Sequence, residues 1–321
     1  MNEKILLHDI WKKFSGESAA FRRAVKVGVG DDAALVRVGG TDVAMTVDSI
    51  VDGVDFDLRY FGWADVGYKA LSAAVSDLYA CGAEPSAFLV TAGIPKGVKR
   101  AQTAALLKGL AESAAVHRAP IVGGDITLSP KLFLDVCAVG RCAGTFKSRA
   151  GARPGDFIFL SGPVGTSRAA LLSFQRRKPV APALRRAHLR PAADRKAGLH
   201  LGRERSVTAM MDISDGLLID LSRLCEASRV SAGIYPNQIP VSPAAKKAFR
   251  AIGKNPREEA AIGGEDFVLL FTVRPPIPES ISAAYRCIGR ILPKQPRGGP
   301  IYNMERRSIN SIKVKGFLHQ F

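Results

Sequence analysis

Cysteine and histidine are scarce in this sequence, with five of each in 321 residues. The cysteines are odd in number and no two are spaced as Cys-x-x-Cys, which argues against a disulfide framework and a cysteine zinc site. We therefore expect five reduced thiols. No Ser-His-Asp or Cys-His arrangement stands out, and we expect surface or hydrogen-bonded histidines rather than catalytic ones.

Two further absences narrow the possible partners. The chain has no run of about eighteen apolar residues, and its first residues, 1–13, show no cleavage-like site. We therefore expect a soluble, cytoplasmic protein with no membrane partner. Aromatic residues make up only 7% of the chain. Single-stranded nucleic acids are bound on aromatic platforms, so this scarcity argues against such a partner.

Positive charge is abundant and unevenly distributed. Lys and Arg outnumber Asp and Glu by 46 to 29, a net charge of +17. Between Lys147 and Arg205 the chain has fourteen basic and three acidic residues, so about eleven of these charges lie there. We interpret this segment as a solvated helical face and disfavour nucleic-acid binding. Its field would still attract small anions.

The length favours two domains. A chain of 321 residues exceeds the usual size of one hydrophobic core, and 47% hydrophobic residues suffice for two. The turn-rich stretch "SRAGARPGD" at 148–156 is typical of a bridge between domains. We expect one domain over 1–146 and a second over 147–321.

Strand-like and helical runs alternate in both halves, which predicts an α+β fold. In the first half, we expect a strand over 42–47 and helices over 65–82 and 97–118. The run "PIVGGDITL" predicts a brief strand, then a glycine turn that carries Asp125. Further strands are expected at 131–140, 156–162, 207–211, 231–235 and 285–292, and helices from Thr166 and up to Ser228.

Aspartates recur where strands end or where glycine and serine form turns. Oxygen ligands without histidine or cysteine suit Mg²⁺, which leaves its remaining positions to water and phosphate oxygens. Each aspartate alone could instead cap a helix or close a turn, because Asp is favoured in both places. The group comprises Asp31, Asp32, Asp48, Asp77, Asp125, Asp212 and Asp215.

The glycine-rich stretches are weak signals by themselves. "SGPVGTSRAALL" resembles a phosphate loop that opens a helix but lacks Gly-Lys-Ser/Thr, and "GVGDDA" lacks the third glycine of a dinucleotide fingerprint. Several Mg²⁺ sites with a cationic second half fit phosphoryl transfer, which depends on charge neutralisation. A phosphate acceptor is already deprotonated near pH 7, so no catalytic base is required.

Taken together, eight motifs resemble the thiamine-monophosphate kinase family. They are "GVGDDAAL", "TVDSIVDGVDF", "YKALSAAVSDLYACGAEP", "IVGGDIT", "SRAGARPGD", "DISDGLLIDL", "GGEDF" and "KGFLHQF", and the resemblance runs from about Phe14 to Phe321. It implies the two αβ domains of the aminoimidazole ribonucleotide synthetase superfamily, the first forming a β-barrel with its mate in a homodimer. It also implies transfer of the γ-phosphate of ATP to thiamine monophosphate, with Mg²⁺, to give thiamine diphosphate.

The resemblance also implies site residues by motif position. As magnesium ligands it implies Asp32, Thr46, Val47 (through its backbone), Asp48, Asp77, Asp125, Asp212 and Asp215, of which Asp32, Asp48, Asp125 and Asp212 form the catalytic set. As ATP contacts it implies Gly124, Asp125, Arg149 and Ser214. As substrate contacts it implies Asp55, Glu265 and Phe317.

Two departures from the family pattern concern the acceptor. Asp55 in "GVDF" stands where the family has histidine, and an anion there would repel a phosphate unless a cation lies between them. "GFLHQF" replaces Gly-aromatic-Asp-His-Phe. The alternative function is a related kinase, or an ATP-dependent synthetase or ligase, with another small acceptor. A basic nucleic-acid-binding protein is the third and least favoured.

Overall fold

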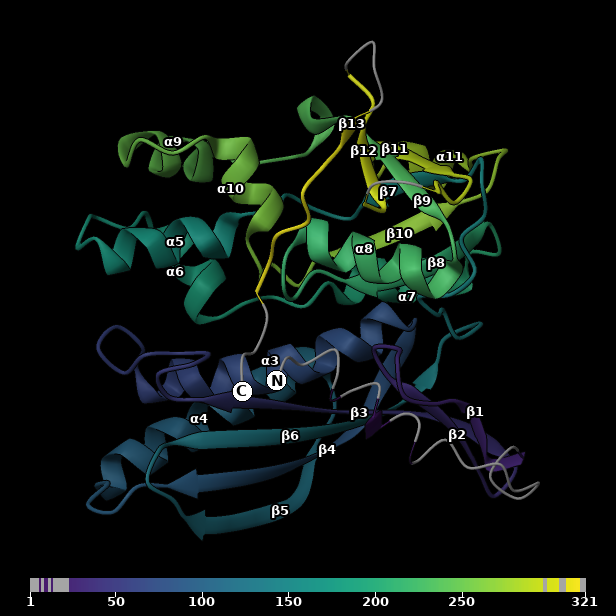
Figure 1. Cartoon of the computed structure of the whole chain (residues 1–321). Coiled ribbons are helices and arrows are strands. Elements are labelled where there is room, and N and C mark those ends of the chain that lie inside the picture. The colour runs from purple at the N-terminus through teal and green to yellow at the C-terminus, as the bar shows by residue number, and fades with distance from the viewer. Residues whose placement is uncertain are drawn as a thin grey trace.

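The computed structural model describes residues 23–296, 299–305 and 310–317, together with residues 6, 9, 10 and 13. The predictions for the N-terminal stretch and for the last residues of "GFLHQF" lie outside this part. Two sheets, each with its own helices, stack on one another (Figure 1). The predicted α+β class is confirmed. No helix among the described residues has the length and hydropathy to cross a membrane.

The first sheet belongs to the first half of the chain. Its strands are β1 (Val25–Val27), β2 (Ala34–Val38), β3 (Thr41–Val51), β4 (Ala83–Ile94), β5 (Ile121–Leu128) and β6 (Phe133–Cys142). Their order is β1-β2-β3-β6-β4-β5, and only the β4–β5 pair is parallel. Within the described chain the sheet is open, with β1 and β5 at its edges, so one copy does not close the expected barrel.

Two helices cover one face of this sheet. They are α3 (Trp63–Ala80) and α4 (Arg100–His117), and Figure 1 shows α3 between the sheet and the second half of the chain. Small residues let α3 pack on both sides; a Cβ on its Gly67 would lie 2.2 Å from the backbone oxygen of Leu106 in α4. On the sheet, β6 alternates buried and half-exposed residues, as expected for one covered face.

Strand β5 corrects one prediction. The glycines of "PIVGGDITL" do not form a turn but lie inside one continuous strand. A Cβ on Gly124 would lie 1.8 Å from the carbonyl oxygen of Val90, so glycine lets β5 approach β4 closely. Asp125 therefore lies on an edge strand.

The second sheet has seven strands in the order β13-β12-β9-β11-β7-β10-β8, and only the β9–β12 pair is parallel. The strands are β7 (Phe157–Leu160), β8 (Val207–Asp212), β9 (Ser231–Ile234), β10 (Leu269–Val273), β11 (Arg286–Leu292), β12 (Ile301–Asn303) and β13 (Asn310–Ser311). All of β10 is buried, because α3 and α7 lie on one side and α8 on the other. The first sheet ends at Cys142 and this one begins at Phe157, and the expected boundary at 146/147 lies between them.

The helices of the second half form two groups. Figure 1 shows α5, α6, α9 and α10 stacked beside the sheet, while α8 packs on it. The bounds are α5 (Thr166–Gln175), α6 (Pro182–Leu189), α7 (Arg195–Arg203), α8 (Leu217–Ser228), η1 (Pro236–Gln238), α9 (Pro243–Ala251), α10 (Pro256–Ile262) and α11 (Glu279–Ser282). The helices expected from Thr166 and up to Ser228 are confirmed.

The basic segment joins the two halves. Arg190 contacts Asp65 at 2.5 Å and Glu112 at 2.7 Å, both in the first half, and Lys147 is buried. The prediction of a solvated face is wrong for these residues, since the domain junction buries or pairs them, but residues 176–178 are exposed as expected. All five cysteines are free thiols, as predicted.

Candidate active site

A cavity of about 1010 Å³ lies between the two halves. The first half contributes the end of β3, the loop after it and the inner side of α3. The second half contributes the loop after β8 and the segments before β10 and around residue 316. The cavity is therefore built at the junction of two domains, where ligand sites are common.

Three aspartates from different elements, Asp77 half-buried and the other two buried, meet beside this cavity. Asp32 precedes β2, Asp77 lies in α3 and Asp212 ends β8. One carboxylate oxygen from each lies within 4.8 Å of the others. We call this group the acidic centre. It brings together ligand positions that the sequence places 45 and 135 residues apart, from 32 to 77 and from 77 to 212.

Few donors neutralise the acidic centre. The Arg149 guanidinium contacts Asp32 Oδ1 at 2.5 and 3.1 Å, while Asp32 Oδ2 is buried and has no hydrogen-bond partner among the described residues. Thr46 donates to Asp77 and Ser76 to Asp212, each at 2.6 Å. Burial and the neighbouring carboxylates raise the pKa of both Asp77 and Asp212 well above the usual range.

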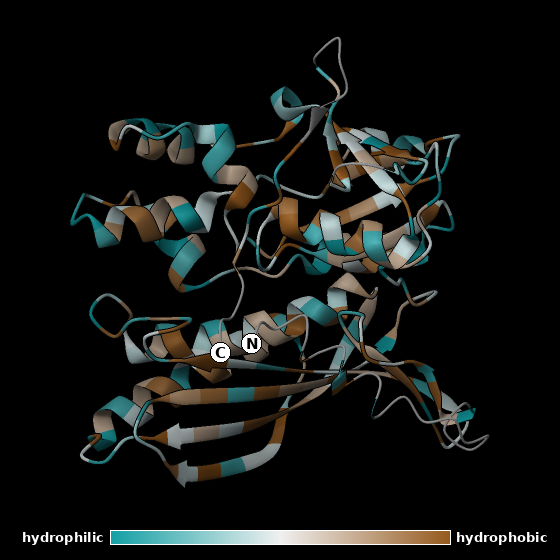
Figure 2. Ribbon diagram, in the orientation of Figure 1, coloured by the Kyte–Doolittle hydropathy of each residue, from teal (hydrophilic) through white to brown (hydrophobic). Residues whose placement is uncertain are grey.

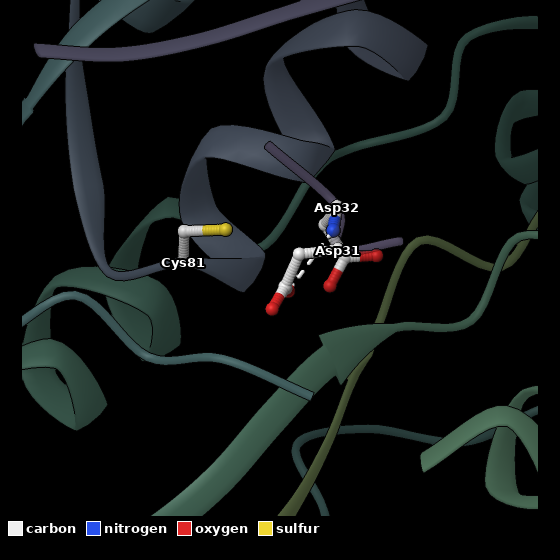
Figure 3. Close-up of side chains that lie close together, drawn as sticks. All are labelled: Asp31, Asp32 and Cys81. Carbon is white, nitrogen blue, oxygen red and sulfur yellow. Dashed lines mark hydrogen bonds between the residues drawn. The ribbon is translucent and has the colours of Figure 1, made fainter. Parts of the chain in front are cut away.

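This donor set fits Mg²⁺. It consists of carboxylate oxygens, one of them buried without a partner, and a hard divalent cation would relieve both the repulsion and the missing contact. Asp31, by contrast, has partners: its carboxylate accepts from the Ser148 hydroxyl and from the backbone N–H of Arg149. Figure 3 shows it beside Asp32 and the Cys81 thiol at the end of α3.

Asp48 lines the cavity from β3. Burial, then Asp55 and two further carboxylates, raise its pKa to about 6, although the backbone N–H of Ser49 opposes the shift. Strand alternation explains its position, because Thr46 and Asp48 point to the side of α3. Asp48 therefore extends the acidic centre into the cavity.

Asp55, the departure from the family pattern, has a local structural role. Its carboxylate accepts the backbone N–H of Val51 at 2.8 Å, which closes the turn after β3. Its carbonyl oxygen accepts from Lys69 Nζ at 2.5 Å. A cation next to Asp55, which the sequence predicts to be necessary for phosphate binding, is thus present as Lys69, although Lys69 contacts the backbone of Asp55 and not its carboxylate.

The remaining expected contacts divide into two sets. Ser214, Asp215, Glu265 and Phe317 all line the cavity. The exposed Gly124, Asp125 and Val47 do not line it. Asp125 instead aligns across the sheet with Thr91, Asp135 and Ser49, the neighbour of Asp48. The expected roles of Gly124, Asp125 and Val47 as ATP or magnesium contacts stay predictions.

Sequence reasoning missed two residues of the cavity wall. Lys69 is 1% exposed. In the sequence it lies among the apolar and small residues of "YKALSAA", a pattern typical of a buried helix face. His188 is buried, shares a 2.8 Å hydrogen bond with Ser167, and has a pKa lowered to about 4, first by burial and then by Lys69. Its place in a basic segment gave no signal of this contact.

Comparisons with known proteins agree with this architecture. The AIR synthase related protein family matches over its N-terminal domain at residues 30–142 and its C-terminal domain at 153–285. Thiamine-monophosphate kinase of Aquifex aeolicus is 36% identical over 248 residues, covering 76% of this chain and 80% of that protein. The Bacillus subtilis thiamine-monophosphate kinase is 33% identical, with 85% and 84% covered.

A solved structure, "AaThiL complexed with AMPPCP and TMP", superposes with a TM-score of 0.86 at 31% identity, covering 99% of this chain and 97% of that one. Two sheets that meet at an acidic cavity, with both family domains matched, place this chain among the AIR synthase related proteins. Within that class it belongs to the thiamine-monophosphate kinase family.

Proposed function

We propose that this protein transfers the γ-phosphoryl group of ATP to thiamine monophosphate and releases thiamine diphosphate and ADP. The observation that carries the proposal is the acidic centre at the wall of a cavity between the domains, in a chain that matches a complex with AMPPCP and TMP over 99% of its length. TMP is taken here as thiamine monophosphate, the substrate in the names of the relatives.

The residues present suit this chemistry. Asp32, Asp77 and Asp212, with Asp48, would hold Mg²⁺, which supplies charge neutralisation for the phosphates. The acceptor phosphate needs no base near pH 7. His188, the one histidine that lines the described cavity, has a lowered pKa and shares a hydrogen bond with the Ser167 hydroxyl. The proposal assigns it no proton transfer, because the acceptor phosphate needs no base.

We further propose a cytoplasmic homodimer joined through the first sheet. The argument is the apolar side chains that this sheet leaves exposed: Val47 on β3 and, on the edge strand β5, Val122, Ile126 and Leu128 are each more than 60% exposed. Figure 2 shows hydrophobic stretches along β4 and β5, on a sheet that has helices on one face only. Sedimentation of the purified protein would give the mass of two chains, whereas a monomer would contradict this part of the proposal.

Product analysis tests the reaction. The purified protein is incubated with ATP, Mg²⁺ and thiamine monophosphate, and thiamine diphosphate, ADP and free phosphate are followed together. We expect equal amounts of thiamine diphosphate and ADP with no free phosphate. Free phosphate formed in step with another product would favour the synthetase alternative, and no turnover of thiamine monophosphate would contradict the proposal.

Asp48→Asn supplies the link between reaction and site. Removing a carboxylate charge at the cavity wall would lower kcat by at least about a hundredfold, because charge neutralisation is the main catalytic contribution. The matched control is Asp42→Asn on the same strand, whose exposed carboxylate pairs with Arg37 at 3.3 Å. Wild-type turnover by Asp48→Asn would show that the metal assignment is wrong.

A further inference from the structure

Lys69 is a buried cation at the junction of the two domains. It projects from α3, is 1% exposed, and is one of the largest fully buried side chains among the described residues. Its ammonium contacts the carbonyl oxygen of Asp55 at 2.5 Å and lies 5.2 Å from the centroid of the Phe61 ring. Burying an ammonium is unfavourable unless it is fully paired, so the remaining partner matters.

That partner is Glu265, on the other domain. Lys69 Nζ lies 2.5 Å from Glu265 Oε1. The other carboxylate oxygen, Oε2, faces the second half of the chain, 3.4 Å from Ser167 Oγ and 3.5 Å from His188 Nδ1. Both oxygens of Glu265 are thus held, one from each domain.

The backbone also holds Glu265 in place. Its φ of 61° lies in the left-handed region, which a glutamate rarely adopts, and its N–H donates to the carbonyl oxygen of Ser214 at 2.7 Å. Its side chain is still 29% exposed and lines the cavity. The chain accepts an unfavourable backbone conformation to present this carboxylate to the cavity in one orientation.

We propose that Lys69 is a positioning residue that holds the carboxylate of Glu265 toward the acceptor, and so sets affinity for thiamine monophosphate rather than for ATP. The inference rests on the proposed function. Without the ammonium, Glu265 would face Asp48 and Asp55 with no compensating charge, and its side chain would turn away. The acidic centre, where ATP phosphates would bind, has its own cation in Arg149.

The test compares Lys69→Met with wild type in steady-state kinetics, varying each substrate at saturation of the other. We expect the KM for thiamine monophosphate to rise by about tenfold to a hundredfold, the loss typical of a charge-assisted contact, with the KM for ATP within about twofold. In a Glu265→Gln background, Lys69→Met should add little, because both changes remove the same contact. Equal increases in both KM values, or effects that multiply in the double variant, would overturn the inference.

Lys147→Met is the matched control. Lys147 is also a buried lysine at the domain junction, but its ammonium donates to the carbonyl oxygens of Glu204 at 2.7 Å and Val207 at 3.3 Å, away from the cavity. We expect this variant to lose stability without an acceptor-specific KM change. A similar KM change there would reduce Lys69 to a structural role and overturn the inference.

Two further outcomes are distinguishable. If Lys69→Met does not fold, Lys69→Gln takes its place, because glutamine keeps a donor toward Glu265 and should raise the KM for thiamine monophosphate by a smaller factor. A ratio of the KM for thiamine monophosphate to the KM for ATP equal to that of wild type would overturn the inference. If wild type itself does not use thiamine monophosphate, the proposed function fails and this inference with it. If wild type does turn over thiamine monophosphate but Lys69→Met raises the KM for both substrates equally, the inference fails and the proposed function stands.

Discussion

The acidic centre and the start of α5 both bury carboxylates, but they differ in what the carboxylate oxygens contact. At α5, Asp266 accepts three backbone N–H groups, from Gly165 at 2.5 Å, Thr166 at 2.9 Å and Ser167 at 3.1 Å. In the acidic centre, by contrast, three carboxylates face one another, and one oxygen of Asp32 has no donor within the part of the chain that the structure describes.

This difference separates a structural carboxylate from a ligand site. Asp266 occupies the N–H groups that would otherwise bind a phosphate at a helix N-terminus, so the loop "SGPVGTSRAALL" has no free anion site despite its appearance. The acidic centre is the reverse case, because its crowded carboxylates are unfavourable without a cation, and the proposed function has them bind one. Burial of charge serves folding in one region and, as proposed, binding in the other.

The largest effect should come from changing the acidic centre. Asp212→Asn should lower kcat by about a thousandfold or more, since a buried metal ligand is lost. Its metal-free protein should be as stable as wild type or about 1 kcal/mol more stable, because one of three crowded charges is gone. Turnover and urea unfolding in a chelator measure the two effects.

The matched control for this change is Asp156→Asn. Asp156 is buried too, but it accepts the N–H of Arg153 at 2.9 Å and the hydroxyl of Thr208 at 2.6 Å, and it does not line the cavity. It should lose stability and keep its kcat. If Asp212→Asn behaves like Asp156→Asn, the distinction between the two kinds of carboxylate fails.

The next effect is expected at α5, where the change lowers stability instead of turnover. Asp266→Ala leaves three partly buried N–H groups without their acceptor and should lower the free energy of unfolding by about 3 kcal/mol, as for lost caps and unpaired donors. The measurement is the urea midpoint with and without Mg²⁺, and Mg²⁺ should stabilise this variant as much as it stabilises wild type. A variant as stable as wild type would show that these contacts contribute nothing.

The sequence was informative where chemistry is local and silent where it depends on packing. The family resemblance, carried by motif order, placed Asp32, Asp77 and Asp212 in a larger set of expected magnesium ligands, and hydrophobic spacing predicted α3. The resemblance separated Asp32, as an expected ligand, from Asp31, but the contacts that distinguish the two carboxylates come from Ser148 and Arg149, more than a hundred residues away.

Two other features also depend on long-range contacts. Lys69 lies in a run of apolar and small residues, and its partner Glu265 is 196 residues distant. The glycines of β5 suggest a turn when the sequence is considered locally. In the structure they instead allow β5 to lie close to β4. Local patterns carry no information about such neighbours.

The smallest effect is a pH dependence of stability, which should distinguish a ligand carboxylate such as Asp48 from a structural carboxylate such as Asp266. Burial, followed by Asp55, raises the folded-state pKa of Asp48 to about 6, so between about pH 4 and pH 6 the folded protein binds more protons than the unfolded chain. This contribution to stability is present at low pH and is lost as pH rises through that range.

Buried histidines act in the opposite direction. Burial lowers the pKa of His117 to about 4, so its contribution to stability is lost as pH falls from about 6.5 to 4. The useful measurement is therefore the difference between wild type and Asp48→Asn in a chelator, across this pH range. We expect no difference near pH 4 and a variant more stable by about 1–2 kcal/mol at pH 7. Saturating Mg²⁺ should abolish or reverse that difference in stability, because Mg²⁺ binds the ionised wild-type site more tightly than the site of the variant. A difference independent of both pH and Mg²⁺ would mean that Asp48 is a structural carboxylate like Asp266.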